Sequence, residues 1–369
     1  MASIFKRLQC SVLKQKAGWR VTVPTFRPDL TREIDLIEEI TRVHGYDRIE
    51  PSLRTNFALQ THQNVLETAA ERIRNVLTGL GFFEAVTVSL LSPREAKAFL
   101  PENAKRLEVL NPLSEDLSTM RPSLLATLLS STAYNLNRKI ADFGLFEIGS
   151  AFWRDNAGSV VEKRRIGAVI TGAAIHQSWR DKARPFTSAD VKGLLEIFAE
   201  RMRLPAPIFE SLQNSSYLLD GWEIFLDGES LGSAGLVNER CRALYGVDAE
   251  VYSFELELDT CLKQIDWSRH AKPIPRYPAV ERDISFIVDE GYPAEKINEL
   301  IKRAGGDFLE KQALFDLYSG KQVPPGKKSM TYSLHFRAPD RTLREAEIDG
   351  WQKNILQALE QNAGAMLRT

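Results

Sequence analysis

Four carboxylates gather around one predicted helix near the start of the chain. Asp35 lies three residues before Glu38 and four before Glu39, so these side chains share a helical face, and Asp29 lies just before the helix. Like charges this close repel each other unless something neutralises them. Mg²⁺ prefers oxygen ligands and is often held by a few carboxylates and waters, so the cluster predicts a magnesium site. The alternative, which spacing alone favours, is a solvated face on which Glu38 pairs with Arg42.

A second candidate is Arg121, which lies in the segment Met120-Arg-Pro-Ser123. After a predicted helix comes the segment Phe146-Glu-Ile-Gly149. An arginine at the edge of a sheet can hold a phosphate with two parallel hydrogen bonds. Two interpretations stay open at this point: a phosphate contact, or a surface arginine that merely precedes an ordinary helix.

A cationic stretch near the C-terminus could bind a nucleic acid. Between residues 317 and 344, six cations stand against one acid, Asp340. The cations are Lys321, Lys327, Lys328, Arg337, Arg341 and Arg344. Tyr318, Tyr332 and Phe336 are interleaved with them, and exposed rings stack on unpaired bases while cations neutralise phosphates. The competing interpretation places Phe336 in the core and the lysines in an ordinary hydrated loop, and the residues alone do not decide.

The composition excludes several classes of protein. Lys plus Arg is 48 and Asp plus Glu is 49, so the net charge of −1 rules out binding of nucleic acid by bulk charge. The cysteines Cys10, Cys241 and Cys261 form no CxxC pair, and the five histidines are scattered, which argues against a disulfide framework or a zinc site. No apolar run reaches the ~18 residues of a membrane span, and no signal-peptide core follows Met1. We therefore expect a cytoplasmic protein with no membrane segment.

Prolines and hydrophobic periodicity divide the 369 residues into three segments, and we predict an α+β protein with domains at 1–52, 53–270 and 275–369. In the first domain a strand at 18–24 precedes a helix at 31–44, which Gly45 ends. The second domain is predicted to be a mostly antiparallel sheet with packed helices. Its predicted helices lie at 66–80, after Ser123 and at 187–202, and its strands at 82–91, 144–153, 166–171, 222–226, 231–237 and 251–258.

The third domain follows a proline-rich linker at 272–275. Its predicted order is a strand at 283–288, a helix at 293–304, strands at 309–317 and 330–336, and a helix at 343–359. This β-α-β-β-α order is the ferredoxin-like split motif.

Three groups of motifs, taken in order, resemble one family: the C-terminal half of the bacterial phenylalanine–tRNA ligase (phenylalanyl-tRNA synthetase) β subunit. The run Gly18–Ile40, with Gly45-Tyr-Asp47, resembles the metal-binding domain of that family. The segments Asn111–Glu115, Met120–Leu125 and Leu145–Gly149 resemble its synthetase-like module. The segments Arg276–Ile284, Gly326–Phe336 and Thr342-Leu343 resemble its ferredoxin-fold anticodon-binding domain.

The resemblance implies a subunit of a class II aminoacyl-tRNA synthetase, which joins phenylalanine to tRNA(Phe) at the expense of ATP. The family works as an α2β2 assembly whose catalytic site lies in the α subunit, so the α subunit and tRNA(Phe) are the expected partners. The resemblance also implies that the carboxylates hold Mg²⁺ and that the C-terminal cations contact tRNA. The implied magnesium ligands are Asp29, Asp35, Glu38 and Glu39.

The synthetase-like module departs from the pattern of an active class II site. Arg121 is present in its second motif, but Ser123 stands where the motif needs a glutamate. The glycine-rich turn and arginine of the third motif are missing from residues 254–261. We therefore expect no catalytic residue in this chain and a scaffold role for the module. Two rivals are a stand-alone RNA-binding paralogue and a self-sufficient enzyme.

The resemblance begins part-way through the first domain, and β chains of the family are usually much longer. We therefore expect a truncated metal-binding domain, and we assign no editing of mischarged tRNA to this chain.

Overall fold

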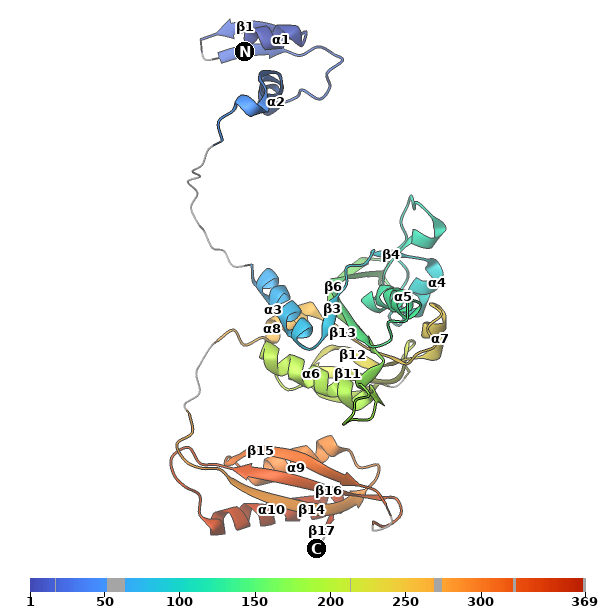
Figure 1. The fold of residues 1–369 in the computed structure, drawn as a ribbon, viewed down its shortest axis with the longest axis vertical. Coiled ribbons are helices and arrows are strands. Elements are labelled where there is room, and N and C mark those ends of the chain that lie inside the picture. Colours follow the sequence, from blue (N-terminus) through green and yellow to red (C-terminus); the bar gives the residue numbers. More distant parts are fainter. Residues whose placement is uncertain (17, 52–63, 213, 269–273, 321–322, 368–369) are drawn as a thin grey trace. The chain divides into compact units, whose positions relative to one another are not determined.

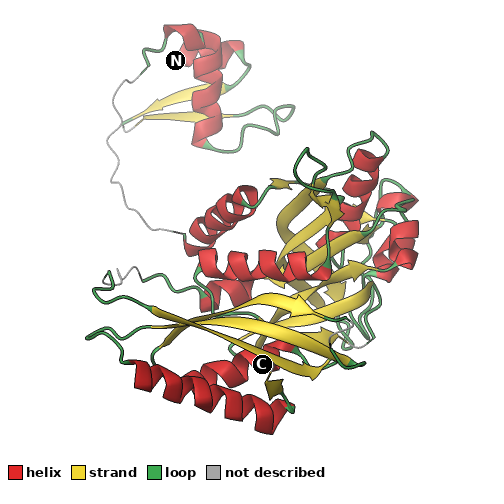
Figure 2. Cartoon of the chain, turned by 60° about the horizontal axis from the view of Figure 1, so that its bottom comes forward, coloured by secondary structure: helices red, strands yellow, loops and turns green. Residues whose placement is uncertain are grey.

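The computed structural model describes residues 1–16, 18–51, 64–212, 214–268, 274–320 and 323–367 (Figure 1). The chain divides into two compact units, Met1–Asp266 and Trp267–Thr369. Both units combine helices with sheets, so the chain is an α+β protein (Figure 2). The predicted domain boundaries at 52 and at 270–275 adjoin the segments 52–63 and 269–273, which lie outside the described residues.

The N-terminal part of the first unit combines two helices with a two-stranded sheet. Its elements are α1 (Ala2–Arg7), the antiparallel pair β1 (Ser11–Gln15) and β2 (Gly18–Thr22), α2 (Glu33–His44) and a 3₁₀ turn (Tyr46–Arg48). Helix α2 ends as predicted, because Gly45 adopts a φ of 100°, which a side chain would disfavour. The small core of this part consists of Phe5, Cys10 and Leu30 with partly buried neighbours.

A seven-stranded sheet forms the centre of the first unit. Its order is β10-β11-β12-β13-β7-β6-β3, and all neighbours pair antiparallel except β3 with β6. The strands are β3 (Phe82–Glu84), β6 (Phe143–Arg154), β7 (Val160–Thr171), β10 (Ile208–Leu212), β11 (Leu218–Leu226), β12 (Glu229–Val237) and β13 (Val251–Glu257). Asp227 and Gly228 form the predicted hairpin turn, with φ values of 46° and 83° that suit a type I′ turn.

The two faces of this sheet carry separate cores, because successive side chains of a strand point to opposite faces. Helices α3 (Val65–Gly79) and α6 (Ser188–Met202) cover one face, and α5 (Leu124–Leu136) covers part of the other. Gly167 allows α5 to approach the sheet, since a Cβ at this position would lie 2.7 Å from the Cβ of Leu124. The shorter elements are β4 (Leu90–Leu91), α4 (Pro93–Ala98), a 3₁₀ turn (Glu115–Leu117), β5 (Thr119–Met120), β8 (Ala173–Ile175), β9 (Arg184–Pro185), α7 (Glu239–Ala243) and α8 (Leu258–Gln264).

The second unit is a four-stranded antiparallel sheet with the order β15-β16-β14-β17. Its elements are β14 (Val280–Asp289), α9 (Ala294–Gly305), β15 (Leu309–Tyr318), β16 (Lys327–Phe336), α10 (Glu345–Ala363) and β17 (Met366–Leu367). Both helices pack on one face of the sheet (Figure 2). The predicted β-α-β-β-α order is present, and β17 adds the strand that the periodicity did not predict.

The differences from the expected elements have local causes. The strand predicted at 82–91 divides into β3 and β4, because the backbone N–H of Thr87 between them donates to the Glu147 carboxylate (3.4 Å) instead of joining a ladder. Helix α8 begins at Leu258, where a strand end was expected. Strands β1 and β10 and helix α1 are short elements that the pattern did not predict. No helix in the described part of the chain is both long and apolar enough to cross a membrane.

We predict that Leu124→Ala destabilises the first unit by about 2–5 kcal/mol, because it leaves a cavity between α5 and Gly167. Urea unfolding of the full chain measures the change. The matched control is Leu113→Ala, since Leu113 is 99 % exposed and its truncation should cost less than about 0.5 kcal/mol. Equal effects of the two substitutions would contradict the packing described for α5.

Candidate functional site

An arginine lies among the carboxylates that the sequence assigns to magnesium. The guanidinium of Arg27 donates to Asp29, with Nη2 2.6 Å and Nε 3.0 Å from the two carboxylate oxygens. The same group lies 3.1 Å from Oε1 of Glu39, and Arg42 donates to Glu39 from the other side at 2.8 Å. The structure thus brings Asp29 and Glu39 together as predicted, but around guanidinium groups.

The remaining two predicted ligands take other roles. Asp35 accepts hydrogen bonds from the backbone N–H groups of Thr31 (3.0 Å) and Arg32 (2.7 Å), so it caps the start of α2. Glu38 is exposed on α2. The alternative pair of Glu38 with Arg42 does not form. Arg42 pairs instead with Glu39, three residues before it.

In this arrangement the four carboxylates do not fit a magnesium ion. The oxygens of Asp29 and Glu39 that would coordinate the ion already accept from Arg27 and Arg42, and those of Asp35 accept from the backbone. Within the described ranges, no group of three or more His, Cys, Asp or Glu side chains could hold a metal ion. The sequence signal that points to this outcome is Arg27 itself, two residues before Asp29.

The contacts set the protonation of these carboxylates. Hydrogen bonds from Arg42 and Arg27 lower the pKa of Glu39 to about 2. The Arg27 guanidinium holds the pKa of Asp29 below its ordinary value, and the backbone N–H of Arg32 does the same for Asp35. All three groups are therefore ionised at neutral pH, as an internal salt-bridge network requires.

Arg121, the candidate phosphate ligand, is 3 % exposed and lies in the core of the first unit. Its guanidinium donates to Glu147 at 2.8 Å, to the Ser150 carbonyl at 3.0 Å and to the Thr87 hydroxyl at 2.8 Å. Its Nε and Nη1 groups are occupied and the side chain is buried, so the structure supports neither of the two open interpretations: Arg121 is neither a phosphate contact nor a surface residue.

The N-terminus of α5 is also closed to a phosphate. Ser123 caps this helix by accepting from the N–H of Leu125 at 3.0 Å. Its hydroxyl donates to Glu255 at 2.9 Å, and the same carboxylate accepts from the N–H of Leu124 at 2.7 Å. A glutamate of this chain therefore takes the position that favours an anion at a helix N-terminus.

A hollow of about 650 Å³ lies over the open part of the second sheet face. Arg165 lines it but forms an ion pair with Glu255, and Tyr217, which is bonded to Ser233 at 2.9 Å, forms another wall. The acidic side chains that line it are Glu102, Glu223, Glu229, Glu255 and Glu257. This excess of negative charge disfavours a nucleoside triphosphate.

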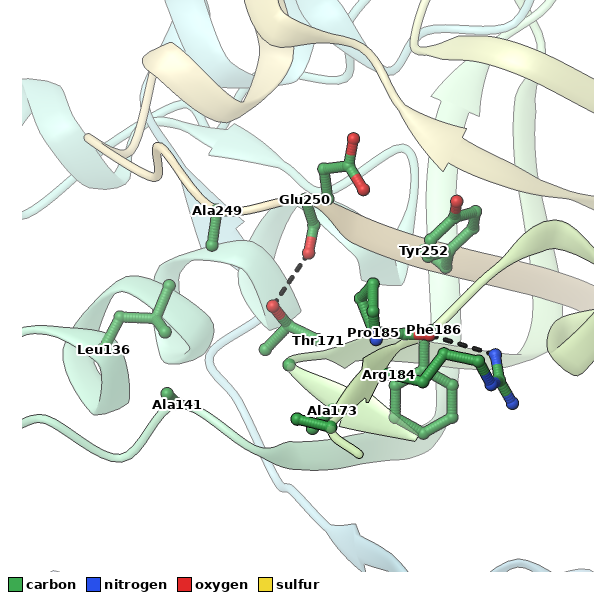
Figure 3. Close-up of a pocket in the computed structure, with 12 residues that line it drawn as sticks. Leu136, Ala141, Thr171, Ala173, Arg184, Pro185, Phe186, Ala249, Glu250 and Tyr252 are labelled. Atoms are coloured by element: carbon green, nitrogen blue, oxygen red, sulfur yellow. Dashed lines mark hydrogen bonds between the residues drawn. The ribbon is translucent and has the colours of Figure 1, made fainter. Parts of the chain in front are cut away.

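A second pocket, of about 390 Å³, lies at the C-terminal end of β7 and the N-terminal end of β13 (Figure 3). Its walls are mainly apolar and come from the α5 end (Leu136), the loop after it (Ala141) and the β8–β9 hairpin (Ala173, Phe186). The hydroxyl of Thr171 is already bonded to the Glu250 carbonyl at 2.8 Å, so few polar groups remain free to fix a ligand.

The described cations of the C-terminal stretch do not form one patch. Lys327 and Lys328 begin β16, whereas the three arginines follow its end, roughly 33 Å away at about 3.3 Å per residue. Most are paired within the unit: Lys327 with Asp289, Lys328 with the Tyr292 carbonyl, Arg337 with Glu310 and Arg341 with Glu347. Arg344 holds Glu347 through its backbone N–H, and Lys321 lies outside the described residues.

Two of the three aromatic residues of the C-terminal stretch lie in the core, as the competing interpretation held for Phe336. Tyr332 and Phe336 are buried against the helices, so they cannot stack on bases. Tyr318 is partly exposed at the end of β15. The alternation along β16 explains this, because the even-numbered residues face the core while Ser329, Thr331 and Ser333 face the other side.

The loop that precedes β5 projects from the first unit near β4 (Figure 1), and it carries two exposed leucines that the sequence analysis did not consider as a surface. We call Leu110 and Leu113, which are both fully exposed, the apolar protrusion. Backbone bonds hold the base of their loop: the Met120 N–H donates to Leu107 at 2.8 Å, and the Val109 N–H donates to Ser118 at 2.9 Å. Its sequence signal is the pair of leucines around Asn111-Pro112.

Three family descriptions match the chain in order. The "tRNA synthetase B5 domain" matches residues 1–46, the "Phenylalanyl tRNA synthetase beta chain CLM domain" residues 49–258 and the "Ferredoxin-fold anticodon binding domain" residues 275–368. Because the second of these covers more than half of the chain, the chain belongs to the phenylalanyl-tRNA synthetase beta-chain family.

Curated relatives agree with this placement. The phenylalanine–tRNA ligase beta subunits of Geobacillus kaustophilus and Bacillus subtilis are each 33 % identical to this chain over 100 % of its length. That of Thermotoga maritima is 31 % identical over 99 % of it. The alignments cover 46 % of each relative, so the chain spans about half the length of the curated relatives it matches. The pyrrolysyl-tRNA synthetase of Desulfitobacterium hafniense is 14 % identical, with a TM-score of 0.43 over 55 % of this chain and 70 % of that one, which is too low to define a fold.

The salt-bridge network predicts a specific titration. The Glu39 pKa of about 2 lies below its ordinary 4.5, so the ionised carboxylate stabilises the folded state above pH 4.5 and loses this effect as the pH falls toward 2. Arg27→Ala should raise the Glu39 pKa, whereas Arg20→Ala, at an exposed cation of β2, should leave it unchanged. Carboxyl NMR between pH 6 and 2.5 measures this, and a wild-type midpoint near 4.5 would contradict the network.

The buried ion pair between Arg121 and Glu147 predicts non-additive effects in a double-mutant cycle. Arg121→Met alone and Glu147→Leu alone should each destabilise the full chain by about 3–5 kcal/mol, because each leaves a buried charge unpaired. The double substitution should cost much less than the sum of the two, which urea unfolding can measure. Additive effects would contradict the pairing of these two groups.

Proposed function

We propose that this chain serves as a β-subunit part of phenylalanine–tRNA ligase, which converts ATP, L-phenylalanine and tRNA(Phe) to Phe-tRNA(Phe), AMP and diphosphate. In this role it scaffolds the catalytic α subunit in the cytoplasm, within an α2β2 assembly, and it contacts tRNA. The observation that carries the scaffold role is the apolar protrusion, because exposed apolar clusters on folded proteins mark interaction sites. The family membership and the relatives named "beta subunit" support a partner subunit for that surface.

The proposed domains are a metal-binding domain at 1–52, a non-catalytic class II synthetase-like core at 53–270 and an anticodon-binding domain at 275–369. The three family matches support this division. The buried Arg121, the α5 N-terminus filled by Glu255 and the acidic hollow support the absence of catalysis in this chain.

The C-terminal cations remain proposed tRNA contacts. For Lys327, Lys328, Arg337 and Arg341 this use requires an exchange of partners, because each is bonded within the unit. Magnesium is the cofactor that the resemblance implies, and the predicted carboxylates do not fit it as they are arranged. No step of the proposal uses a metal held by this chain.

The proposal is tested by charging of tRNA(Phe) with labelled phenylalanine and ATP. The chain together with the α subunit from the same source should form Phe-tRNA, and the chain alone should not activate phenylalanine. Failure of the pair to charge tRNA would refute the subunit role, and activation by the chain alone would refute the non-catalytic assignment.

The apolar protrusion predicts a sharper effect on assembly. Leu110→Asp with Leu113→Asp should abolish co-purification with the α subunit, because two charges would have to be buried at the contact. The unfolding midpoint of the isolated chain should not change, since both leucines are fully exposed. The matched control is Leu219→Asp on β11, at another exposed leucine, which should assemble normally. Assembly of the double variant would place the contact elsewhere.

A further inference from the structure

A hairpin and a loop lie side by side at one end of the central sheet. The hairpin is β8–β9, and the loop is residues 137–142, which follow α5. The Asp142 carboxylate joins them, because it accepts from the Ala173 N–H at 2.8 Å and lies 3.5 Å from His176. Both segments also line the pocket of Figure 3, which contains Ala141 on one side and Ala173 and Arg184 on the other.

The turn between β8 and β9 presents a tryptophan to solvent. Trp179 is 97 % exposed, although it lies in a well-bonded turn. The Ser178 hydroxyl accepts from the N–H groups of Arg180 (3.2 Å) and Asp181 (2.8 Å), and the Ser178 N–H donates to the Asp181 carbonyl at 2.9 Å. A fixed turn that leaves a whole indole ring in water makes that ring available to a partner.

Cations lie in the hairpin that carries this ring and in the adjoining loop. Residues 134–142 and 173–184 hold five cationic side chains against two acidic ones. Of these cations, Arg184 is paired with Asp190, whereas Lys139, Arg180 and Lys182 have no acidic partner within 4.0 Å among the described residues. Arg138 stacks on the exposed ring of Tyr134, 3.4 Å from its centroid. This differs from the C-terminal stretch, where most of the described cations are bonded within the unit.

We propose that this hairpin patch, made of Lys139, Trp179, Arg180 and Lys182, is an RNA contact of the chain. An unpaired base stacks on Trp179, and the three cations neutralise neighbouring phosphates. The inference rests on the proposed function, since tRNA is then the RNA at hand, and it adds a contact outside the C-terminal unit. RNA is favoured over a protein partner because the patch is cationic, whereas the apolar protrusion consists of two exposed leucines.

The test measures binding of a tRNA(Phe) transcript to the full chain across a series of KCl concentrations. Arg180→Ala with Lys182→Ala should weaken binding and flatten the slope of log K against log salt by about 1.5, close to the value for two phosphate contacts. Trp179→Ala should weaken binding by about tenfold at an unchanged slope, because stacking releases no counterions. Trp179→Phe should restore most of the affinity.

The matched control is Lys6→Ala with Arg7→Ala, which removes two exposed cations of α1 and should leave both affinity and slope unchanged. Unfolding midpoints of all variants should equal that of the wild type, because every changed side chain is exposed. Wild-type binding with unaffected hairpin variants would overturn the hairpin contact alone. No tRNA binding by the wild type would overturn both this contact and the tRNA role. Loss of α-subunit binding by Trp179→Ala at unchanged RNA affinity would make the hairpin a protein contact instead.

Discussion

The buried ion pair between Arg121 and Glu147 is the interaction on which the first unit depends. An unpaired buried charge costs several kcal/mol of folding free energy, so the two side chains stay together. The groups that they hydrogen-bond are thereby held in position. Through the Thr87 hydroxyl it holds the segment that presents Val86 and Val88 to solvent. It also removes from solvent Arg121, which the sequence offers as a phosphate ligand in the first unit. The same contact therefore fixes the segment before β4 and keeps Arg121 from binding a phosphate.

The surfaces of the chain differ in whether their charged side chains are paired. In the N-terminal part, Arg27 and Arg42 neutralise Asp29 and Glu39, and in the C-terminal stretch Lys327, Arg337 and Arg341 have acidic partners as well. Two other surfaces differ from these. The apolar protrusion consists of two exposed leucines, which suits a protein partner, and the hairpin patch has cations with no acidic partner within 4.0 Å among the described residues, which suits phosphates.

Periodicity predicted the long elements of this fold well. The expected helix at 66–80 is α3 at Val65–Gly79, and the helix expected at 187–202 is α6 at Ser188–Met202, because both have a clear apolar face. Strand β17 could not be predicted, since two residues have no period and it forms only by pairing with β14.

The site was less predictable, because residue type does not fix the partner. The spacing correctly placed Asp29 near Glu39. Whether a metal or a guanidinium lies between them depends on the direction of the Arg27 side chain, which the spacing does not determine. Tyr332 and Phe336 have the composition of a stacking surface, and only the register of β16 reveals that they face the core. The hairpin patch has a weak signal, a tryptophan between polar residues in Gln177-Ser-Trp-Arg-Asp-Lys182, which gains meaning only from its exposure.

The central claim is that this chain scaffolds a catalytic partner. The most direct test is the native mass, by light scattering, of the chain co-expressed with the α subunit from the same source. The account predicts a mass that requires both chains, with two of each as the expected stoichiometry. A mass equal to this chain alone, or to a multiple of it, would contradict the scaffold role.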